Sequence, residues 1–494
     1  MSSLKWVFLW TDVTIWVLVA CLVAYIAWVR RNPALRANWR KVFEDRGAMA
    51  SAVVLTACLT VTLLDSVHYR NALAPTAGEP GKALAYDTRT RSVLDAVLVR
   101  LIESREATYS LPLATVSFTK ESVEVEGRVQ RVAPRLKFGG AHLRDPQSEQ
   151  WADLWWRGVA GCLAGALASL LLGAALVMGV ARSRQLAWRP AARQVWQGEG
   201  PLPWRVAWIT VAILLTAGGL VASWAGAYHV LGTDLTGNDV LYQSLKSIRT
   251  AFVIGSLATL ATLPVAVVLG ITAGYFGGWV DEVIQYVYTV LSSVPNVLLI
   301  AACVLMVQVF IDQHPDLYET GAERSDLKLF LLCTVLGLTG WAGLCRLLRG
   351  ETLKLRELEY VQAATAFGVS HARIMARHLF PNVAHLMLIV TVLEFSSLIL
   401  YEAVLSYVGV GVDPSMNSFG GMINLARSEM SRDPLVWWSF ASAFGFMVTL
   451  VLAANLFADG VQAAFDPRAK SLRPRRRLVS APASVGVKGQ GSLK

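Results

Sequence analysis

Residues 251–275 read AFVIGSLATLATLPVAVVLGITAGY, and this run of 25 residues contains no charged side chain. A helix that crosses the hydrocarbon core of a bilayer needs about 20 mostly apolar residues. Such a helix also pairs every backbone polar group within its own segment, which lipid requires. The sequence therefore predicts a transmembrane helix at this position.

Eight further stretches have the same apolar character, although the sixth and eighth spans of the chain are the least uniform. The chain of 494 residues is 54% hydrophobic and 16% charged, whereas a soluble domain is roughly 25% charged. This composition excludes a soluble globule, a disordered chain and a disulfide-rich secreted scaffold. We therefore predict an all-α polytopic membrane protein with about nine transmembrane helices. The other predicted spans are 6–28, 49–69, 158–181, 206–230, 283–310, 329–347, 386–408 and 436–459.

Positively charged side chains predict the orientation of these spans, because Lys and Arg gather in short cytoplasmic loops. With nine spans, four basic segments fall on one side, which is expected to be cytoplasmic. The N-terminus is then outside and the C-terminus cytoplasmic. Anionic lipid headgroups account for the net charge of +10, and no nucleic acid is required. The basic segments are 30–46, 182–205, 349–377 and 468–477.

Span density and composition divide the chain into five parts. An N-terminal extension with two spans precedes a small external α+β domain. A third span and a basic cytoplasmic linker follow, then a core of six helices and a basic tail that is predicted to be disordered. Asp12 and Asp65, near the ends of the first two spans, are expected to reach the membrane interface. The five parts are 1–69, 70–157, 158–205, 206–468 and 469–494.

The external segment 70–157 begins with a Pro/Gly-rich linker at 75–81. Apolar residues spaced four apart predict an amphipathic helix from Ser92 to Glu103. Alternating apolar and β-branched residues predict strands at 116–118 and 123–132. No chemistry is evident in this domain, and a docking or spacer role is the simplest interpretation.

A polar segment between the seventh and eighth spans, EYVQAATAFGVSHARIMARHLFPN at 359–382, has the pattern of an ordered corner. Residues 353–367 favour a helix, and Gly368 can adopt the left-handed conformation that ends one. Ser370 can cap a second helix at 372–380, and Pro381 suits the start of the next span.

Ala363 and Ala364 give the first of these helices a shallow face that another protein could approach closely. Arg356, Arg373 and Arg377 surround that face with positive charge. From the loop alone, an amphipathic helix that lies on lipid is an equally good interpretation.

The segment resembles the EAA loop of permeases from bacterial ATP-binding-cassette (ABC) importers, whose pattern is E-A-A-x3-G-x9-I-x-L-P. Here the pattern reads Gln362-Ala363-Ala364, then Gly368, then His378-Leu379-Phe380-Pro381. The departures at Gln362, His378 and Phe380 resemble the dipeptide/oligopeptide subfamily, which usually has a basic residue at the first position and histidine at the later one. Four other segments resemble motifs of that subfamily in the same order: 231–241, 273–282, 401–423 and 454–468.

This resemblance implies a permease subunit in the bacterial cytoplasmic (inner) membrane that forms half of a pathway for peptides or similar small solutes. It implies a second homologous permease, two ABC ATPase subunits and a periplasmic substrate-binding protein as partners. The chain has no phosphate-binding G-x-x-x-x-G-K-[ST] loop. It is therefore expected to be no enzyme and to bind no cofactor or metal, while ATP and Mg bind to the partner ATPases. The residues expected to couple to the ATPase are Glu359, Gln362, Ala363, Ala364, Gly368 and Pro381.

Two carboxylates inside the predicted eighth span need a function, because an acidic side chain is costly in lipid. Glu402 fills an acidic position of the subfamily, and Glu394 lies two helical turns deeper. We expect them to face the pathway or the interface between permeases. A proton relay through them would instead indicate an ion-coupled secondary transporter. A third hypothesis is a membrane-anchored receptor or scaffold that binds its partner through 70–157.

Overall fold

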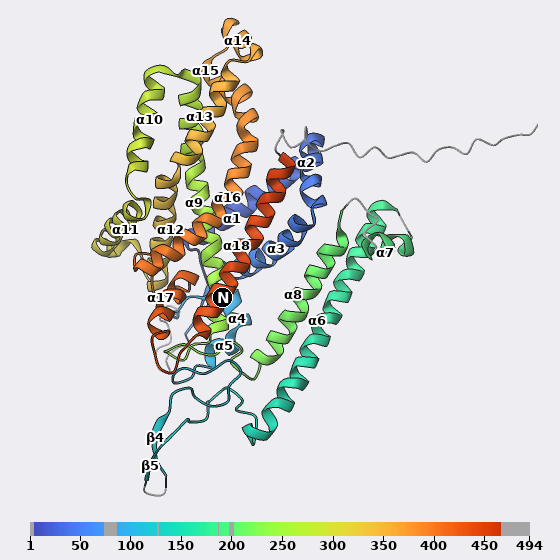
Figure 1. The fold of residues 1–494 in the computed structure, drawn as a ribbon, viewed down its shortest axis with the longest axis vertical. Helices are drawn as coiled ribbons and strands as arrows, with labels where there is room; N and C mark the ends of the chain where they lie inside the picture. The colour runs from blue at the N-terminus through green and yellow to red at the C-terminus, as the bar shows by residue number, and fades with distance from the viewer. Residues whose placement is uncertain (1–3, 74–85, 126–127, 186, 197–201, 466–494) are drawn as a thin grey trace, which may run out of the picture.

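The structure, a computed structural model, describes residues 4–73, 86–125, 128–185, 187–196 and 202–465. It is a bundle of long helices with a small mixed region at one end (Figure 1). The predicted tail at 469–494 and the Pro/Gly-rich linker at 75–81 lie outside the described residues.

Nine helical segments in the described part of the chain are long and apolar enough to cross a membrane, which confirms the predicted all-α polytopic class. Two of them are interrupted: α12 (Gly321–Gly340) continues into α13 (Ala342–Arg356), and α15 (His371–Ile374) continues through a π-helical turn into α16 (Phe380–Val408). The other seven are α1 (Trp10–Arg31), α3 (Arg46–Asp65), α6 (Pro146–Arg184), α8 (Trp204–Ala225), α9 (Val240–Phe276), α11 (Asn296–Gln313) and α18 (Trp438–Phe465).

The predicted sixth span at 283–310 is wrong as a single helix. The structure has α10 (Gly278–Ser293) and α11, with Val294 between them in an extended conformation at φ −86° and ψ 133°. Pro295 explains the break, because the residue before a proline is sterically excluded from the helical region. Only α11 is long and apolar enough to cross the membrane.

Helix α9 is the central element of the core. Its 37 residues extend for about 55 Å, well beyond the hydrocarbon core of a bilayer, which is about 30 Å thick. It packs against α3, α12, α13 and α16. Two glycines bring it close to α13: a Cβ at Gly270 would lie 2.8 Å from the Cys345 carbonyl oxygen, and one at Gly274 would lie 2.7 Å from that of Arg349. Small residues four apart thus allow close contact between helices.

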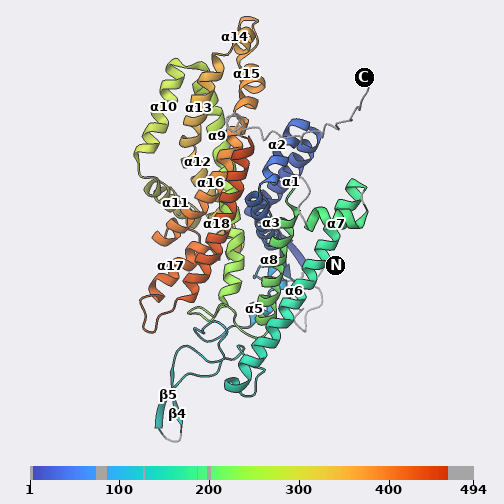
Figure 2. The ribbon, with the colours of Figure 1, turned by 45° about the vertical axis from the view of Figure 1, so that its right-hand side comes forward.

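The N-terminal helices lie along one side of the core. Helices α2 (Pro33–Glu44) and α3 pack against α18, and α3 also contacts α8 and α9. Helices α6 and α8 form a long antiparallel pair at the edge of the molecule (Figure 2). Gly161 and Gly219 meet where these helices cross, since a Cβ at either residue would lie 2.5 Å from the other's carbonyl oxygen. The short helix α7 (Trp188–Trp196) packs against α6 and α8.

The predicted external segment contains both helix and strand, but its elements differ from the prediction. The predicted helix from Ser92 to Glu103 is broken at Leu98 into α4 (Val93–Val97) and α5 (Val99–Glu103). The predicted strand at 123–132 is a hairpin of β4 (Glu121–Val125) and β5 (Arg128–Val132).

The predicted strand at 116–118 forms only isolated bridges, at Val116 and Ser117. A second sheet has no counterpart in the sequence analysis: β1 (Leu4–Val7), β2 (His68–Asn71) and β3 (Arg91–Ser92) pair antiparallel in that order.

A buried cation on α9 binds carboxylates from two other helices. The Arg249 side chain, 5% exposed, donates to Asp12 Oδ1 of α1 over 2.6 Å and lies 3.6 Å from Asp326 Oδ1 of α12. Asp12 Oδ2 also lies 2.7 Å from His68 Nδ1 of β2. Arg249 therefore joins the N-terminal extension to the core.

A second cation, Lys246, lies one turn earlier on the same helix. Its Nζ lies 3.2 Å from Asp65 Oδ1 at the end of α3 and 2.8 Å from Asp95 Oδ1 of α4. Asp12 and Asp65 are each 2% exposed. Both carboxylates therefore pair with cations of this chain, and their predicted position near the membrane interface stays a prediction.

A histidine between two carboxylates attaches the 104–140 segment to the loop before α9. His229 Nδ1 lies 2.8 Å from Asp239 Oδ2, and its Nε2 lies 3.4 Å from Glu106 Oε1. Glu106 also accepts hydrogen bonds from the backbone amides of residues 137–139 at 2.8–3.0 Å. Burial raises the pKa of Glu106, but the hydrogen bonds from His229 and from these backbone amides outweigh burial and lower the pKa to about 2. Burial likewise opposes protonation of His229, but its two carboxylate partners raise its pKa to about 9.

These shifts predict that the 104–140 segment is held most firmly from about pH 4.5 to 6.5. Glu106 stabilises the folded chain above its ordinary pKa of 4.5, and this contribution is lost as the pH falls toward 2. His229 stabilises it below its ordinary pKa of 6.5, and this contribution is lost as the pH rises through 9. Hydrogen exchange of amides 104–119, corrected for intrinsic rates, should lose at least about tenfold protection between pH 6 and pH 9. In a Glu106→Gln variant this loss should be much smaller, and an equal loss in both proteins would contradict the assignment.

Candidate functional site

The predicted loop at 359–382 protrudes from one end of the helix bundle. Helix α14 (Glu359–Ala366) is the outermost element there, and the β4–β5 hairpin lies at the opposite end of the molecule (Figure 1). The predicted helix at 353–367 is not continuous. Helix α13 ends at Arg356, and Leu358 is extended at ψ 140° before α14 begins. This break turns α14 away from the long axis of α13.

Gly368 forms the predicted corner. Its φ is +74°, in the left-handed region that favours glycine. The amide of Gly368 donates to the Thr365 carbonyl over 3.0 Å, and the amide of Val369 donates to the Ala364 carbonyl over 3.1 Å. This pair of hydrogen bonds is the Schellman motif, which pairs the last carbonyls of a helix. The sequence analysis therefore predicted both the position and the conformation of this turn.

The second half of the loop differs from the prediction. Ser370 precedes α15, but its side chain makes no capping hydrogen bond; its carbonyl instead accepts from the amides of Arg373 and Ile374. The helix then widens into a π turn at Met375–Leu379 before α16 begins. Pro381, in the first turn of α16, lacks an amide, and a wider turn relieves the clash between its ring and the preceding carbonyl. The loop thus runs without interruption into the membrane span.

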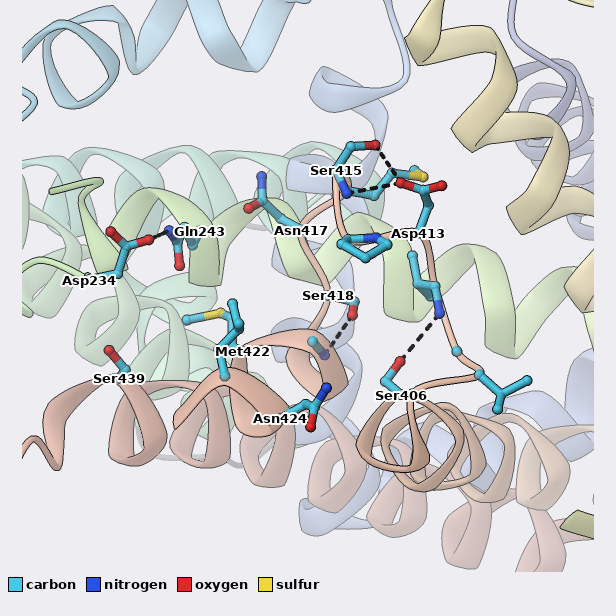
Figure 3. A pocket seen from close by; sticks show the side chains of 18 of the residues that line it. Asp234, Gln243, Ser406, Asp413, Ser415, Asn417, Ser418, Met422, Asn424 and Ser439 are labelled. Atoms are coloured by element: carbon cyan, nitrogen blue, oxygen red, sulfur yellow. Dashed lines mark hydrogen bonds between the residues drawn. The ribbon is translucent and has the colours of Figure 1, made fainter. Parts of the chain in front are cut away.

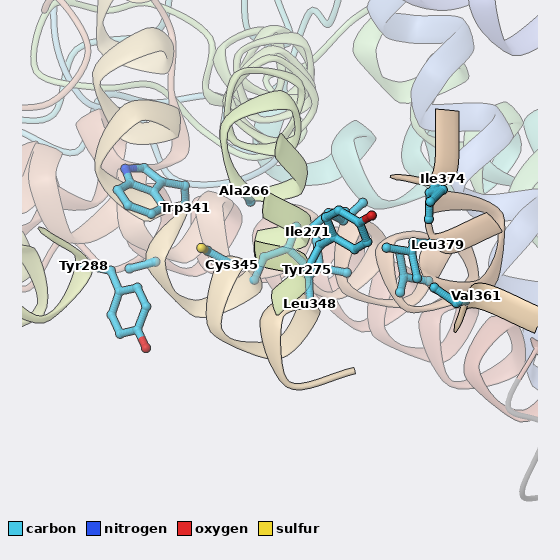
Figure 4. Packing of buried hydrophobic residues seen from close by; sticks show 13 residues of the cluster. Ala266, Ile271, Tyr275, Tyr288, Trp341, Cys345, Leu348, Val361, Ile374 and Leu379 are labelled. Carbon is cyan, nitrogen blue, oxygen red and sulfur yellow. The ribbon is translucent and has the colours of Figure 1, made fainter. Parts of the chain in front are cut away.

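Buried side chains attach the loop firmly to the core. Val361 of α14, Ile374 of α15 and Leu379 of the π turn are each at most 1% exposed, and they pack with Tyr275 of α9 and Leu348 of α13 (Figure 4). Burying an aliphatic side chain of this size stabilises a fold by about 1.5–3 kcal/mol. The loop is therefore packed firmly against the ends of α9 and α13.

A polar contact reinforces this attachment. Tyr275 Oη lies 2.8 Å from His371 Nδ1, and Arg356 Nη1 donates to the Tyr275 carbonyl over 3.4 Å. The first contact joins the loop to the last turn of α9, and the second joins the end of α13 to the same turn.

The outer face of the loop carries the side chains that another protein could contact. Glu359, Gln362 and Ala363 are exposed, whereas Ala364 is half-buried against the core. Phe367, which was not among the predicted coupling residues, has a side chain that is 87% exposed at the tip. An aromatic side chain directly before the glycine of a polar loop was the available signal for it.

The two predicted membrane carboxylates lie apart from the loop, on α16. Glu394 is half-buried. Glu402 is 1% exposed, and its Oε1 accepts a hydrogen bond from Ser406 Oγ over 2.7 Å. Glu402 also lies against α17 (Phe419–Glu429), because a Cβ at Gly420 would lie 2.8 Å from its Oε1. Its carboxylate therefore contacts this chain, and its predicted role at a pathway or subunit interface stays a prediction.

A cavity of about 620 Å³ lies near the end of the core that is opposite the loop. The start of α9, α11, α12, the segment between α16 and α17, and α17 itself form its walls (Figure 3). Its volume is within the range of about 300–1,000 Å³ that is usual for small-molecule sites. The sequence analysis missed this cavity, since its lining comes from segments far apart in the chain.

Known proteins share the core of this chain. A profile of the family described as "binding-protein-dependent transport system inner membrane component" matches residues 266–471. The oligopeptide transport system permease OppC of Mycobacterium tuberculosis is 33% identical over 248 residues, which are 50% of this chain and 79% of that protein. The glutathione transport system permease GsiD of Pectobacterium atrosepticum is 30% identical over 243 residues, or 49% of this chain and 74% of that protein.

The family profile covers the C-terminal part of the chain, and each of these relatives matches about half of it. Three observations indicate the same family: the helical core, the ordered loop, and the match to most of the length of these relatives. The chain therefore belongs to the family of binding-protein-dependent transport system inner membrane components, the permease subunits of ABC importers.

Proposed function

We propose that this chain forms half of the translocation pathway of an ATP-driven importer of peptides in a bacterial inner membrane. A second homologous permease supplies the other half, and a periplasmic binding protein delivers the substrate. Two ABC ATPase subunits bind ATP and Mg and drive transport. Peptides are proposed because the similar permeases include proteins named for oligopeptide and dipeptide transport.

The observation that carries this proposal is the rigid, protruding loop at 359–382. Its inner face is buried among the ends of three long helices, and its outer face presents Phe367 and Ala363 to solvent. A rigid element of this kind can pass movement of a bound ATPase to the membrane helices. Glu359, Gln362 and Ala363 would contact the ATPase, while Ala364, Gly368 and Pro381 set the shape of the loop.

The proposed orientation places this loop in the cytoplasm and the β4–β5 hairpin outside. The basic segments 30–46 and 182–205 then lie on the cytoplasmic side with the loop. The N-terminus is outside, the C-terminus is cytoplasmic, and the 70–157 segment forms an external domain. Tryptophans exposed at the outer end of α6, Trp151 and Trp155, suit a membrane–water interface.

A photo-crosslinking experiment tests the function and the orientation together. Benzoylphenylalanine replaces Phe367 at the tip of the loop, or Phe8, which is 82% exposed in the N-terminal segment that is proposed to be external. Irradiated membranes that contain the whole importer should yield a crosslink to the ATPase from position 367. Position 8 is the matched control and should yield none.

A crosslink to the ATPase from position 8, or its absence from position 367, would refute the proposed coupling. An ion-coupled transporter would in addition continue uptake after ATP depletion and stop when the proton gradient is abolished. A receptor or scaffold would import nothing.

A further inference from the structure

The cavity of about 620 Å³ beside α17 has two ends of different chemistry. At one end Lys328 Nζ lies 3.1 Å from Asp413 Oδ2, so these two charges neutralise each other. Asp234 and Ser439 lie toward the other end (Figure 3), and Glu429 also lines the cavity. The two ends therefore differ in charge.

Glu429 leaves half of its hydrogen-bonding capacity unused inside the protein. Glu429 is buried, with 5% of its surface exposed. One oxygen, Oε1, accepts from the Tyr109 hydroxyl over 2.9 Å. The other, Oε2, is buried without a hydrogen-bond partner in the described structure. A buried polar atom without a partner costs about 1–3 kcal/mol, so this oxygen is available to accept a hydrogen bond from a ligand in the cavity.

A second unpaired atom lines the same cavity. Ser439, at the start of α18, is 6% exposed, and its Oγ has no hydrogen-bond partner in the described residues. A hydroxyl and a carboxylate oxygen are both acceptors. Together they suit a ligand group that donates several hydrogen bonds.

The charge at this end favours a cation. Asp234 accepts hydrogen bonds from the Gln243 side chain and from the backbone amides of Thr236 and Asn238, all neutral donors. Burial raises the pKa of Glu429, and the negative charge of Asp234 raises it further. The charges of Asp234 and Glu429 therefore add to one another. Arg432 also lines the cavity, with its guanidinium 5.4 Å from the centre of the Tyr109 ring, and its positive charge lowers the pKa of Glu429. Its side chain is exposed, so solvent screens this charge, whereas Glu429 is buried.

We infer that this end of the cavity binds the protonated amino terminus of a peptide on its way through the permease. Glu429 and Ser439 accept the hydrogen bonds of the ammonium group, and Asp234 contributes its field. The other end accommodates the rest of the peptide. The inference rests on the proposed function, because it names a subsite within that pathway.

The test uses the whole importer in proteoliposomes and an equimolar library of free tripeptides, with uptake followed by mass spectrometry. Glu429→Gln keeps one acceptor oxygen for Tyr109, removes the charge and replaces the second acceptor oxygen by an amide donor. It should lower peptide uptake at least about tenfold, as expected for loss of a charge-assisted hydrogen bond. Ser439→Ala should lower uptake less. Glu103→Gln, at an exposed external position away from this cavity, is the matched control and should have no effect.

Photo-crosslinking separates direct contact from a structural effect. A tripeptide with photoleucine at its first position should label the 425–439 segment in the wild-type importer and lose that labelling in Glu429→Gln. Wild-type uptake by Glu429→Gln, or labelling of another region, would overturn the inference while leaving the proposed function intact. An importer that carries no tripeptide even with the wild-type chain would refute the proposed peptide function itself.

Discussion

Replacing Arg249 by methionine will destabilise the whole chain. The guanidinium binds Asp12 and lies within ion-pair distance of Asp326, and all three side chains are at most 5% exposed. Removing one partner of a buried ion pair costs about 3–5 kcal/mol, because the other charge stays in the interior without compensation. The melting temperature in detergent should fall by on the order of 3–5 °C.

Two further variants separate charge from packing in this experiment. Arg324→Met is the matched control, since Arg324 pairs with Asp312 at the surface and both side chains are well exposed; ion pairs of that kind contribute little. Adding Asp12→Asn to Arg249→Met removes one uncompensated charge and should restore part of the lost stability. If Arg249→Met melts like the wild type, the N-terminal extension is not held by this cation.

The sequence predicted the features that depend on neighbouring residues. Apolar runs indicated nine spans. A helix-forming stretch that ends at Gly368 indicated the corner of the loop. The break before Pro295 was also local, but it lay within a run apolar enough to cross the membrane in one piece. The apolar character of the run masked the turn.

Features that depend on distant residues were not predictable in this way. Strand β1 pairs with β2 across the first two spans, and neither strand has a distinctive pattern. Tyr109 and Glu429 form a hydrogen bond although they are 320 residues apart. The fold, rather than any local spacing, brings these groups together, so the cavity beside α17 and the buried ion pairs are evident only from the structure.

The conformation of Gly368 leads to the second large effect, which is on coupling. Space around this residue is open, because a Cβ would meet no atom within 4 Å. The only obstacle to a larger residue is its φ of +74°, which costs an L-residue about 1–2 kcal/mol and a β-branched residue more. Gly368→Val should therefore abolish the Schellman turn and change the direction in which α14 leaves the core.

In proteoliposomes with the ATPases and the binding protein, Gly368→Val should transport at least about tenfold more slowly, since a loop in a different orientation no longer follows the ATPase. Gly350→Val is the matched control: this glycine of α13 also has open space around it, but its backbone is helical. It should transport normally, because valine is no worse than glycine in a helix. Gly368→Asn should be intermediate, because asparagine tolerates the left-handed region. Equal transport by the two valine variants would show that the shape of this corner does not matter for coupling, and the loop would then lose its proposed role as the rigid link to the ATPase.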